Sequence, residues 1–477
     1  MKVLLYNWVS FDDEKGRGGG VTVYLKNLIS HVKEYINVGN TDLEITFLYS
    51  GTSYDIYDRS IRYERIEQCK ECPNYTIVNS SVFAPAYLSF PQIDTVLNDT
   101  QLKETFVHFL EEKGPFDVVH FHNLEGLSLK VLEAKELFPE TKFIYTIHNY
   151  YAFCPQVNLW QKEQRCCRKE NTDAECYECM KYHVPLKKLE HKMAMNYTLQ
   201  KRYSDVLKKA YLQCGEKIDE CYREEEFGEV KSVDKERIER VLSVYRNEFV
   251  TYINKYIDVV LGVSKRVCDI AKKMQIDEAK IRVSYIGTKA AENAKDASNA
   301  TEYQNGIELI YLGYKRPDKG YFFLLDVLDN LSESIAKEIS VTIAAKQLPD
   351  YDDRKIDVSK FRNFTTMNGY NREALGELLK GKHLGIVPVL WEDNLPQVAI
   401  EMVAEGVPII ASDRGGASEL GNNELFCFEA GNVKACCDRI AYFVEKPERI
   451  QSFWDEASRL VTMKEHMSEL LEIYGER

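Results

Sequence analysis

Short apolar runs rich in β-branched residues alternate along the chain with longer segments in which apolar residues recur every three or four positions. The first pattern is typical of buried strands and the second of amphipathic helices, so the alternation predicts βαβ units with parallel sheets. A first series of strands is expected at 2–7, 43–49, 117–122 and 142–148. A second series is expected at 259–264, 307–313, 339–345, 384–389 and 407–412.

The two series of strands predict two Rossmann-like, doubly wound α/β domains that face each other across a cleft. At 477 residues the chain exceeds the usual size of a single hydrophobic core. We expect an N-terminal domain over residues 1–256 and a C-terminal domain over 257–454. Residues 154–250 are expected to form an insertion, in which helices follow a Cys-rich loop. An amphipathic helix at about 455–477 is expected to pack back on the N-terminal domain.

The net charge of the chain argues against some classes of binding partner. A formal net charge of −13 argues against a nucleic-acid binder, because phosphate backbones are bound by clustered Lys and Arg. No stretch approaches the roughly 18 to 20 apolar residues that span a bilayer, so we expect a cytoplasmic protein. Residues 181–210 hold eight Lys or Arg against two acids. A solvated helix face is the default explanation of this segment, and peripheral contact with anionic lipid headgroups is the alternative.

The cysteines offer a candidate metal site. Thirteen cysteines in a chain expected to be cytosolic favour metal ligands or buried thiols over disulfides. Cys154, Cys166 or Cys167, and the pair Cys176-x2-Cys179 supply four thiolates, which suit tetrahedral Zn²⁺. We expect either a structural zinc site or a set of unliganded thiols.

Two carboxylates bracket a predicted helix start in "PVLWEDNLPQVAIEMVAEGVPIIASDRGG", residues 388–416. Pro396 suits the first helical position, so free N–H groups around Asn394 and Leu395 are expected to face the cleft. A helix N-terminus attracts phosphate. Glu401 can accept hydrogen bonds from two neighbouring hydroxyls, as in ribose, and Asp393 from a second polyol. The alternative is an ordinary helix with a capping carboxylate and a solvated Glu.

This segment resembles the E-x7-E motif of family 4 glycosyltransferases, retaining enzymes of the B-type glycosyltransferase fold. Asp393 stands at the first Glu of that motif and Glu401 at the second. Other segments resemble the family in the same order, and together they cover nearly the whole chain outside the insertion. They are RGGGVTVYLKNL (17–28), FDVVHFHN (116–123), TIHNYYAFCP (146–155), VLGVS (260–264), YLGYKRPDKG (311–320) and MNGYNREAL (367–375).

The resemblance implies roles for the residues around the helix start. In the family the second Glu binds the ribose of the donor nucleotide and the first approaches the donor sugar, which implies these roles for Glu401 and Asp393. The backbone at Asn394 and Leu395 is then expected to face the sugar and diphosphate. The resemblance also implies a donor-binding role for residues at other strand ends, namely Gly19, Gly20, Gly313, Gly369 and Tyr370.

The segment "LGYKRPDKG" resembles the family's G-R-x4-K-G motif, whose Arg and Lys neutralise the departing diphosphate. Lys319 fits the Lys position. Tyr314 stands where Arg is usual, so Arg316, two residues on, is the candidate for that charge. The resemblance also implies that His148 lies beside the donor sugar, with a purely structural histidine as the alternative. For His122 the structural interpretation is favoured.

The resemblance implies an enzyme that moves a sugar from a nucleotide diphosphate donor to a hydroxyl acceptor with retention of configuration and without a catalytic metal. A UDP-sugar is favoured as donor and a GDP-sugar is the alternative. The acceptor is expected to be a saccharide or lipid-linked saccharide in the synthesis of a bacterial surface polysaccharide or related glycan. Because Tyr314 and Asp393 depart from the family pattern, a non-catalytic subunit or glycan-binding scaffold of the same fold is the alternative.

Overall fold

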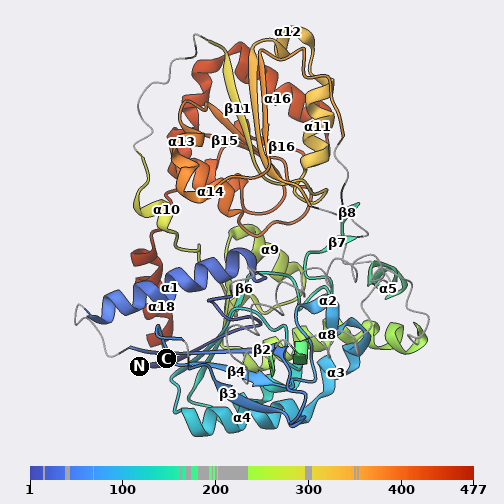
Figure 1. Cartoon of the computed structure of the whole chain (residues 1–477), viewed down its shortest axis with the longest axis vertical. Helices are drawn as coiled ribbons and strands as arrows, with labels where there is room; N and C mark the ends of the chain where they lie inside the picture. Colours follow the sequence, from blue (N-terminus) through green and yellow to red (C-terminus); the bar gives the residue numbers. More distant parts are fainter. Residues whose placement is uncertain are drawn as a thin grey trace.

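The computed structural model describes the chain except residues 14–16, 38–42, 68, 162–163, 168–172, 181–192, 196, 199–200, 202–234, 296–302, 304, 349–350, 352–353 and 477. Two mainly parallel sheets, one in each of two α/β domains, form its centre, and the domains lie one above the other (Figure 1). This confirms the predicted α/β class and the two doubly wound domains. Among the described helices, none combines the length and the apolar character that crossing a bilayer requires.

The first sheet has eight strands in the order β10-β9-β6-β5-β1-β2-β4-β3. Only β3, which pairs with β4, runs antiparallel to its neighbour. The central strands are buried almost throughout, as expected for apolar runs in a parallel sheet that is covered on both faces. The strands are β1 (Lys2–Asn7), β2 (Glu44–Ser53), β3 (Arg62–Arg65), β4 (Asn74–Val78), β5 (Val118–Phe121), β6 (Lys142–Ile147), β9 (Val259–Gly262) and β10 (Ile281–Val283).

The expected domain boundary at residue 257 is too early, because β9 and β10 belong to the first sheet. Tyr145 of β6 pairs in parallel with Val260 of β9, and β10 pairs with β9. The preceding helix α8 (Lys235–Tyr256) returns the chain to the same sheet. The apolar run at 259–264 predicts a buried strand, but the composition of such a run does not indicate which sheet it joins.

The second sheet has six parallel strands in the order β13-β12-β11-β14-β15-β16. This is the doubly wound order in which the direction of winding reverses between the first strand and the fourth, here β11 and β14. Ligands of such sheets bind beyond the carboxyl ends of the strands at that reversal. The strands are β11 (Ile307–Tyr314), β12 (Ile339–Lys346), β13 (Asn363–Met367), β14 (Leu384–Val387), β15 (Ile409–Ser412) and β16 (Cys427–Phe428).

The helices connect these strands, and several have a side-chain cap at the start. Ser264 caps α9, and Figure 1 shows this helix at the junction between the domains. Besides α8, the helices of four or more residues in the described part of the chain are α1 (Gly19–Asn37), α2 (Ala86–Ser89), α3 (Ile93–Asn98), α4 (Thr100–Lys113), η2 (Leu129–Glu136), α5 (Asp173–Met180), α9 (Lys265–Lys273), α10 (Lys289–Glu292), α11 (Tyr321–Asn330), α12 (Glu333–Ala336), α13 (Leu375–Leu379), α14 (Gln397–Ala404), α15 (Ser418–Gly421), α16 (Val433–Glu445), η6 (Pro447–Ser452), α17 (Phe453–Glu456) and α18 (Met463–Gly475).

Between β6 and β9 the structure describes a small hairpin, the helix α5 and the helix α8. The hairpin pairs β7 (Trp160–Gln161) with β8 (Arg165–Cys166) in antiparallel fashion. Helix α8 buries the apolar positions whose spacing predicted it, which are Ile238, Leu242, Tyr245, Phe249 and Ile253. The rest of this stretch lies largely outside the described residues.

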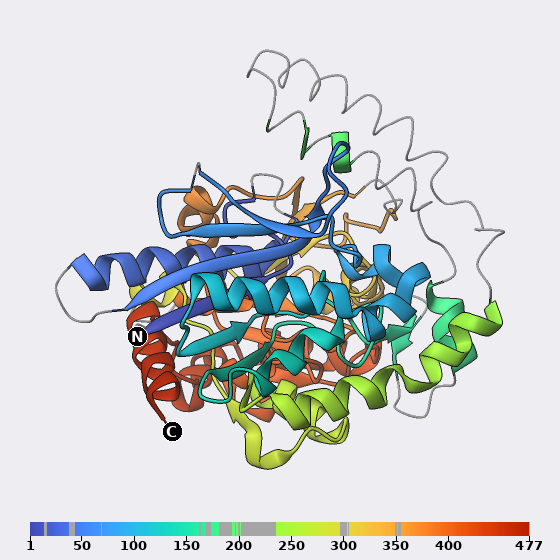
Figure 2. The same ribbon diagram turned by 90° about the horizontal axis from the view of Figure 1, so that it is seen from below.

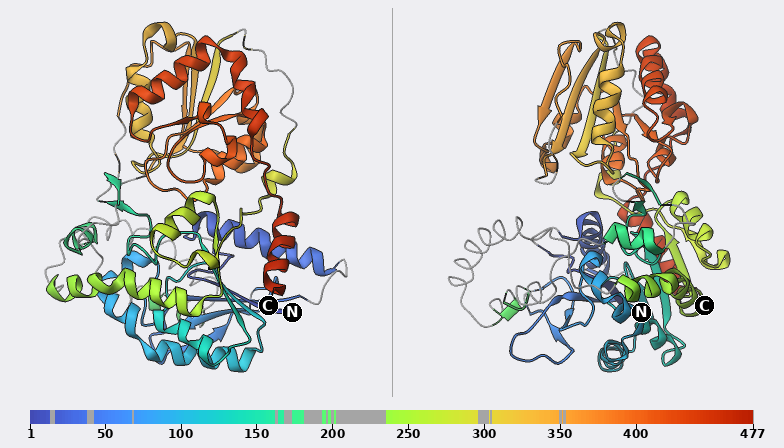
Figure 3. Two further views of the ribbon diagram at one scale, coloured as in Figure 1. Left: turned by 180° about the vertical axis from the view of Figure 1, so that it is seen from behind. Right: turned by 90° about the vertical axis from the view of Figure 1, so that its right-hand side faces the viewer.

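The last helix, α18, lies on the first domain, so that the C-terminus is near the N-terminus (Figures 1, 2 and 3). The helix expected at about 455–477 begins later than predicted, at Met463. Thr462 and Glu465 form a capping box at its start. His466 Nε2 lies 2.7 Å from the hydroxyl of Tyr24 on α1. The packing of α18 is thus anchored by a polar contact as well as by apolar burial.

A cluster of histidines lies under α18 at the ends of β5 and β6. His120 Nδ1 lies 2.7 Å from the Tyr474 hydroxyl, and the rings of His120 and His122 are tilted by 32° with centroids 4.0 Å apart. His122 Nδ1 in turn lies 3.2 Å from His148 Nε2. Burial, reinforced by repulsion from the neighbouring histidines, lowers the pKa of His120 and His122 well below the ordinary value. We infer that both imidazoles are neutral in the folded protein.

We predict that the protein loses stability as the pH falls below about 6.5, because the unfolded chain then binds protons that the buried imidazoles do not. Each such histidine contributes at most about 1.4 kcal/mol per pH unit to this slope. The variant His122→Asn should have a shallower dependence of unfolding free energy on pH between 7.5 and 5.5, measured by urea titration. The variant His108→Gln is the control, because the His108 side chain is 65% exposed. Equal slopes in both variants would contradict the prediction.

Candidate active site

The structure brings Lys319 and Asp393 together at the carboxyl ends of β11 and β14. Lys319 Nζ lies 2.6 Å from Asp393 Oδ2, and it also lies 4.9 Å from the centre of the Trp391 ring. The Asp393 side chain is 10% exposed and that of Lys319 is 28% exposed. An ammonium group is therefore held at the reversal of strand order, where the fold leads us to expect a ligand.

The start of α14 follows Asp393 directly. Pro396 is the N-cap of this helix, with φ −62° and ψ 124°, and not its first helical residue as the sequence predicted. Asn394 and Leu395, predicted to face the cleft, are buried. The Asn394 side chain donates a hydrogen bond of 3.0 Å to the carbonyl of Ile147, at the end of β6 in the first domain. The loop before α14 therefore contacts the first domain directly.

Glu392, the neighbour of Asp393, is engaged elsewhere. It accepts hydrogen bonds from Arg266 Nε at 2.7 Å, from Arg414 Nη1 at 3.2 Å and from the backbone N–H of Gly415 at 3.2 Å. Burial alone would raise the pKa of Glu392, but Arg266, Gly415 and Arg414 together hold it below its usual range. Asp393 is thus the carboxylate of this pair that contacts Lys319.

Sequence reasoning missed this charge cluster of Glu392, Arg266 and Arg414. Its members are far apart in the chain, and Arg266 lies on α9, in the first domain. A second carboxylate, Glu419, accepts hydrogen bonds from the backbone N–H groups of Lys265 and Arg266 at the start of that helix. No motif or spacing in the sequence indicates these contacts, because they join the two domains.

Arg316 does not join Lys319 and Asp393 but is bound to its own loop. Its Nε and Nη2 donate hydrogen bonds of 2.8 and 3.0 Å to the two carboxylate oxygens of Asp318. Tyr314, which replaces the usual Arg of the motif, is 46% exposed. Of the two predicted cations, Lys319 is therefore the one that donates a hydrogen bond to Asp393.

Glu401 lies on α14 and meets Tyr370, another predicted donor-binding residue. The Tyr370 hydroxyl donates a hydrogen bond of 3.1 Å to Glu401 Oε2. Gly369, which precedes Tyr370, has φ +79°, and Gly313 at the end of β11 has φ +151°. The structure thus joins Glu401 to the loop after β13. Gly313 lies at the end of β11, and Lys319 lies in the loop that follows this strand.

The glycine-rich start of α1 approaches α14 from the first domain. Gln397, the first residue of α14, donates a hydrogen bond of 3.1 Å from Nε2 to the carbonyl of Gly20. Gly19 begins α1 with φ +55°. Gly19 and Gly20 therefore lie at the edge of the same region as the start of α14.

His148 directly follows β6 and is half-buried. Besides its contact with His122, its ring lies 5.2 Å from that of Tyr24, centre to centre. Burial and repulsion from His466 lower the pKa of His148 to about 3. Because Asn394 binds the carbonyl of the preceding residue, Ile147, His148 lies near the loop that carries Asp393.

All but one of the cysteines predicted as first-choice metal ligands line the same pocket. Cys154, Cys176 and Cys179 line one pocket, and the fourth cysteine in that pocket is Cys167. Cys166, the first choice from the sequence, is directed away, with its sulfur 3.1 Å from the carbonyl of Leu390. The alternative, Cys167, is therefore the one that lines a pocket with the other three cysteines, and metal binding stays a prediction.

The basic segment 181–210 lies almost wholly outside the described residues. Of its eight basic residues only Lys201 is described, and its ammonium group contacts Glu64 at 2.5 Å. The predicted lipid contact of this segment stays a prediction.

Comparison with known proteins assigns the fold. Residues 293–460 match the model of the family described as glycosyl transferases group 1, and no curated protein matches the chain. Among solved structures, sucrose-phosphate synthase from Thermosynechococcus elongatus is similar over 99% of this chain and 98% of its own, with 13% identity and a TM-score of 0.54. The Anabaena protein HepE in complex with UDP is similar over 99% of both chains, with 12% identity and a TM-score of 0.57.

A trehalose-phosphate synthase from Burkholderia xenovorans, in complex with glucose-6-phosphate, is similar over the whole of both chains, with 10% identity and a TM-score of 0.53. At such identities the likeness concerns the fold. The match to the family model covers the second sheet, with Lys319, Asp393 and Glu401. The chain as a whole therefore has the B-type glycosyltransferase fold, and residues 293–460 are similar to the glycosyl transferases group 1 family.

Proposed function

We propose that the chain is a retaining glycosyltransferase that transfers a sugar from a nucleoside diphosphate to a hydroxyl acceptor. The observation that carries the proposal is the pair Lys319–Asp393, which lies beside the start of α14 in the glycosyl transferases group 1 domain. Negative charge builds on the diphosphate as the sugar departs. A lysine ammonium and a helix N-terminus both stabilise that charge, and neither has to reorganise first.

The nucleoside is bound, in this proposal, through Glu401. Its carboxylate accepts the hydrogen bonds of the two ribose hydroxyls, and the Tyr370 hydroxyl keeps it oriented. A UDP-sugar is the favoured donor, because HepE, which shares the fold, has been solved with UDP and with UDP-glucose. A GDP-sugar is the alternative.

The sugar lies between Asp393 and His148. Asp393 orients the Lys319 ammonium and accepts a hydrogen bond from a sugar hydroxyl. With its lowered pKa, His148 is a neutral imidazole at physiological pH, so it hydrogen-bonds a sugar hydroxyl without adding positive charge. The acceptor hydroxyl attacks on the face from which the diphosphate leaves, which retains the configuration without an enzyme nucleophile and without a catalytic metal.

The acceptor in this proposal is a saccharide or lipid-linked saccharide, and the product is a bacterial surface polysaccharide or related glycan. The reaction takes place in the cytoplasm or at the cytoplasmic face of the membrane. Release of nucleoside diphosphate from a panel of UDP- and GDP-sugars, measured without acceptor, tests the activity. Binding of a nucleoside diphosphate with no turnover of any donor would instead favour a non-catalytic scaffold.

Lys319→Ala is expected to lower kcat for nucleoside diphosphate release roughly 100- to 1,000-fold, as removal of a preorganised electrostatic group typically does. Arg316→Ala is the matched control, because Asp318 already binds this guanidinium. We expect it to change kcat by less than about tenfold, since its guanidinium is bound within its own loop, whereas Lys319 contacts Asp393. An equal loss in the two variants would show that Arg316 also serves the diphosphate.

Glu401→Ala is expected to weaken binding of UDP at least about tenfold in calorimetric titrations, because hydrogen bonds to a charged group contribute roughly 1.5–3 kcal/mol. Glu377→Ala provides the control, since that side chain is 84% exposed. If both variants bind UDP as the unaltered protein does, Glu401 is not a ribose ligand.

Asp393→Asn is expected to lower turnover strongly while UDP affinity changes little, because this side chain faces the sugar and not the nucleoside. Glu392→Gln should instead lower the free energy of unfolding by about 1–3 kcal/mol, since two arginines lose their charged partner. Turnover and urea unfolding are measured on both variants. Loss of turnover in Glu392→Gln at unchanged stability would place the reactive carboxylate one residue earlier.

A further inference from the structure

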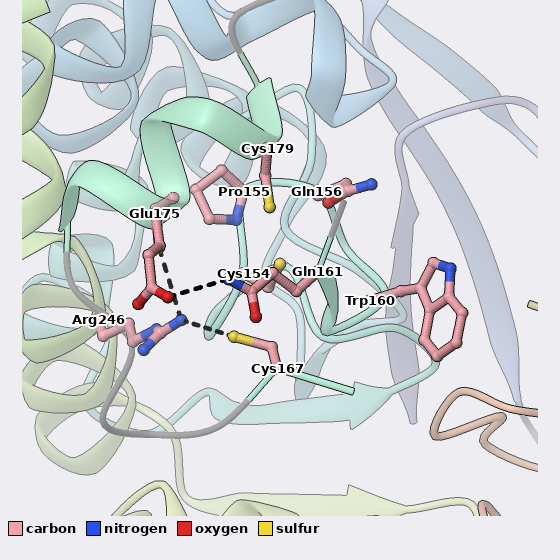
Figure 4. A pocket seen from close by; sticks show the side chains of 10 residues that line it. Cys154, Pro155, Gln156, Trp160, Gln161, Cys167, Glu175, Cys179 and Arg246 are labelled. Carbon is pink, nitrogen blue, oxygen red and sulfur yellow. Dashed lines mark hydrogen bonds between the residues drawn. The ribbon is translucent and has the colours of Figure 1, made fainter. Parts of the chain in front are cut away.

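Four cysteine side chains line a single pocket in the first half of the chain. Cys154 lies in the loop between β6 and β7, Cys167 follows β8, and Cys176 and Cys179 lie one turn apart on α5. Figure 4 shows the sulfurs of Cys154, Cys167 and Cys179 directed into one space beside Arg246. Each of the four side chains is buried or half-buried. Three separate chain segments thus each contribute a cysteine to the lining of one pocket.

The turn after Cys154 is built around its sulfur. The backbone N–H groups of Gln156 and Leu159 interact with the Cys154 side chain. Val157 has φ +67°, a conformation that a β-branched residue rarely adopts, and Leu159 has φ +51°. The backbone therefore accepts an unfavourable conformation in the turn that follows Cys154 and lines the same pocket.

Arg246 of α8 supplies positive charge beside these sulfurs. Its guanidinium donates to the carbonyl of Phe153 at 2.6 Å, and its Nη2 lies 3.6 Å from the sulfur of Cys167 and 3.8 Å from that of Cys176. A divalent ion bound by four thiolates leaves a net charge of −2 in the complex. A half-buried arginine that donates hydrogen bonds to the ligand sulfurs compensates that charge and orients the ligands.

We propose that Cys154, Cys167, Cys176 and Cys179 bind one structural Zn²⁺ ion in a closed tetrahedral site. Four thiols lose their protons to solvent as the four Zn–S bonds form, and no electron is transferred. In the described residues no three of these sulfurs yet lie within 4.8 Å of one another, so the ion would draw them together. This site goes beyond the proposed glycosyl transfer and does not depend on it.

Cys166 is excluded from the site by the hairpin. Successive side chains of a strand point to opposite faces, and Cys166 ends β8 while Cys167 follows it. The Cys166 sulfur contacts Leu390 in the second domain, and Cys167 faces the other three thiols. A zinc ion would therefore hold the hairpin in the position from which Cys166 reaches the loop that leads to Asp393.

The test is metal analysis of the full-length chain, expressed with added zinc and purified without chelator. We expect about one zinc per chain by mass spectrometry of the elements. Replacement of the zinc by Co²⁺ should give the sulfur-to-cobalt charge-transfer bands and the intense visible bands of a tetrahedral thiolate site. Neither measurement depends on transferase activity, so failure of the proposed function would leave the result intact.

The adjacent cysteines provide matched variants. Cys167→Ser should bind zinc at least about tenfold more weakly in competition with a coloured chelator, whereas Cys166→Ser should retain full binding. Wild-type protein without zinc after reconstitution, or with iron in its place, would overturn the proposal. Equal zinc affinity in the two variants would overturn the assignment of Cys167. If Cys167→Ser does not fold, the zinc content and the Co²⁺ spectrum of the wild-type protein still decide the question.

Discussion

A buried carboxylate, Glu392, holds the two domains together at the point where the candidate active site is assembled. It belongs to the second domain and accepts hydrogen bonds from Arg266 of the first domain and Arg414 of its own. A carboxylate with 9% of its side chain exposed is stable only when it is paired, and loss of one partner is costly. The position of the loop that carries Glu392 is therefore set relative to α9, on the first domain.

The pairing of Glu392 with arginines also determines which contact Asp393 makes. Because Glu392 is bound by arginines, Asp393 is left to meet Lys319, 2.6 Å away. Gly415 makes this arrangement possible, since a side chain there would collide with the carbonyl of Asp393, and its φ of +69° favours glycine. The two adjacent acids thus have different roles. Glu392 holds the domains together, and Asp393 orients the ammonium group of Lys319.

The local features of this fold could be predicted from sequence, and the long-range contacts could not. The pattern of apolar residues predicted α8 and the strands β1, β2, β5, β6, β9, β11, β12, β14 and β15, because burial of a face depends on neighbours in the chain. It did not predict β3, β4, β10, β13 or β16. The sheet that β9 joins, the choice between Cys166 and Cys167, and the binding of Arg316 by Asp318 depend on pairing and side-chain direction. The family resemblance supplied Lys319, Asp393 and Glu401, but it carried no information on Arg266.

The loop from Leu390 to Asp393 is held along its whole length. The N–H of Leu390 donates to Asp318 at 2.9 Å, its carbonyl accepts from Cys166, and the carbonyl of Asp393 accepts from the N–H of Gly416 at 2.9 Å. Stabilisation of developing charge is effective when the groups need not reorganise during the reaction. With its backbone fixed from both domains, this loop directs the Asp393 carboxylate to Lys319, so the ammonium group is in position before a substrate binds. A separation of the domains at α9 would release that position, and for this reason the junction and the candidate active site cannot vary independently.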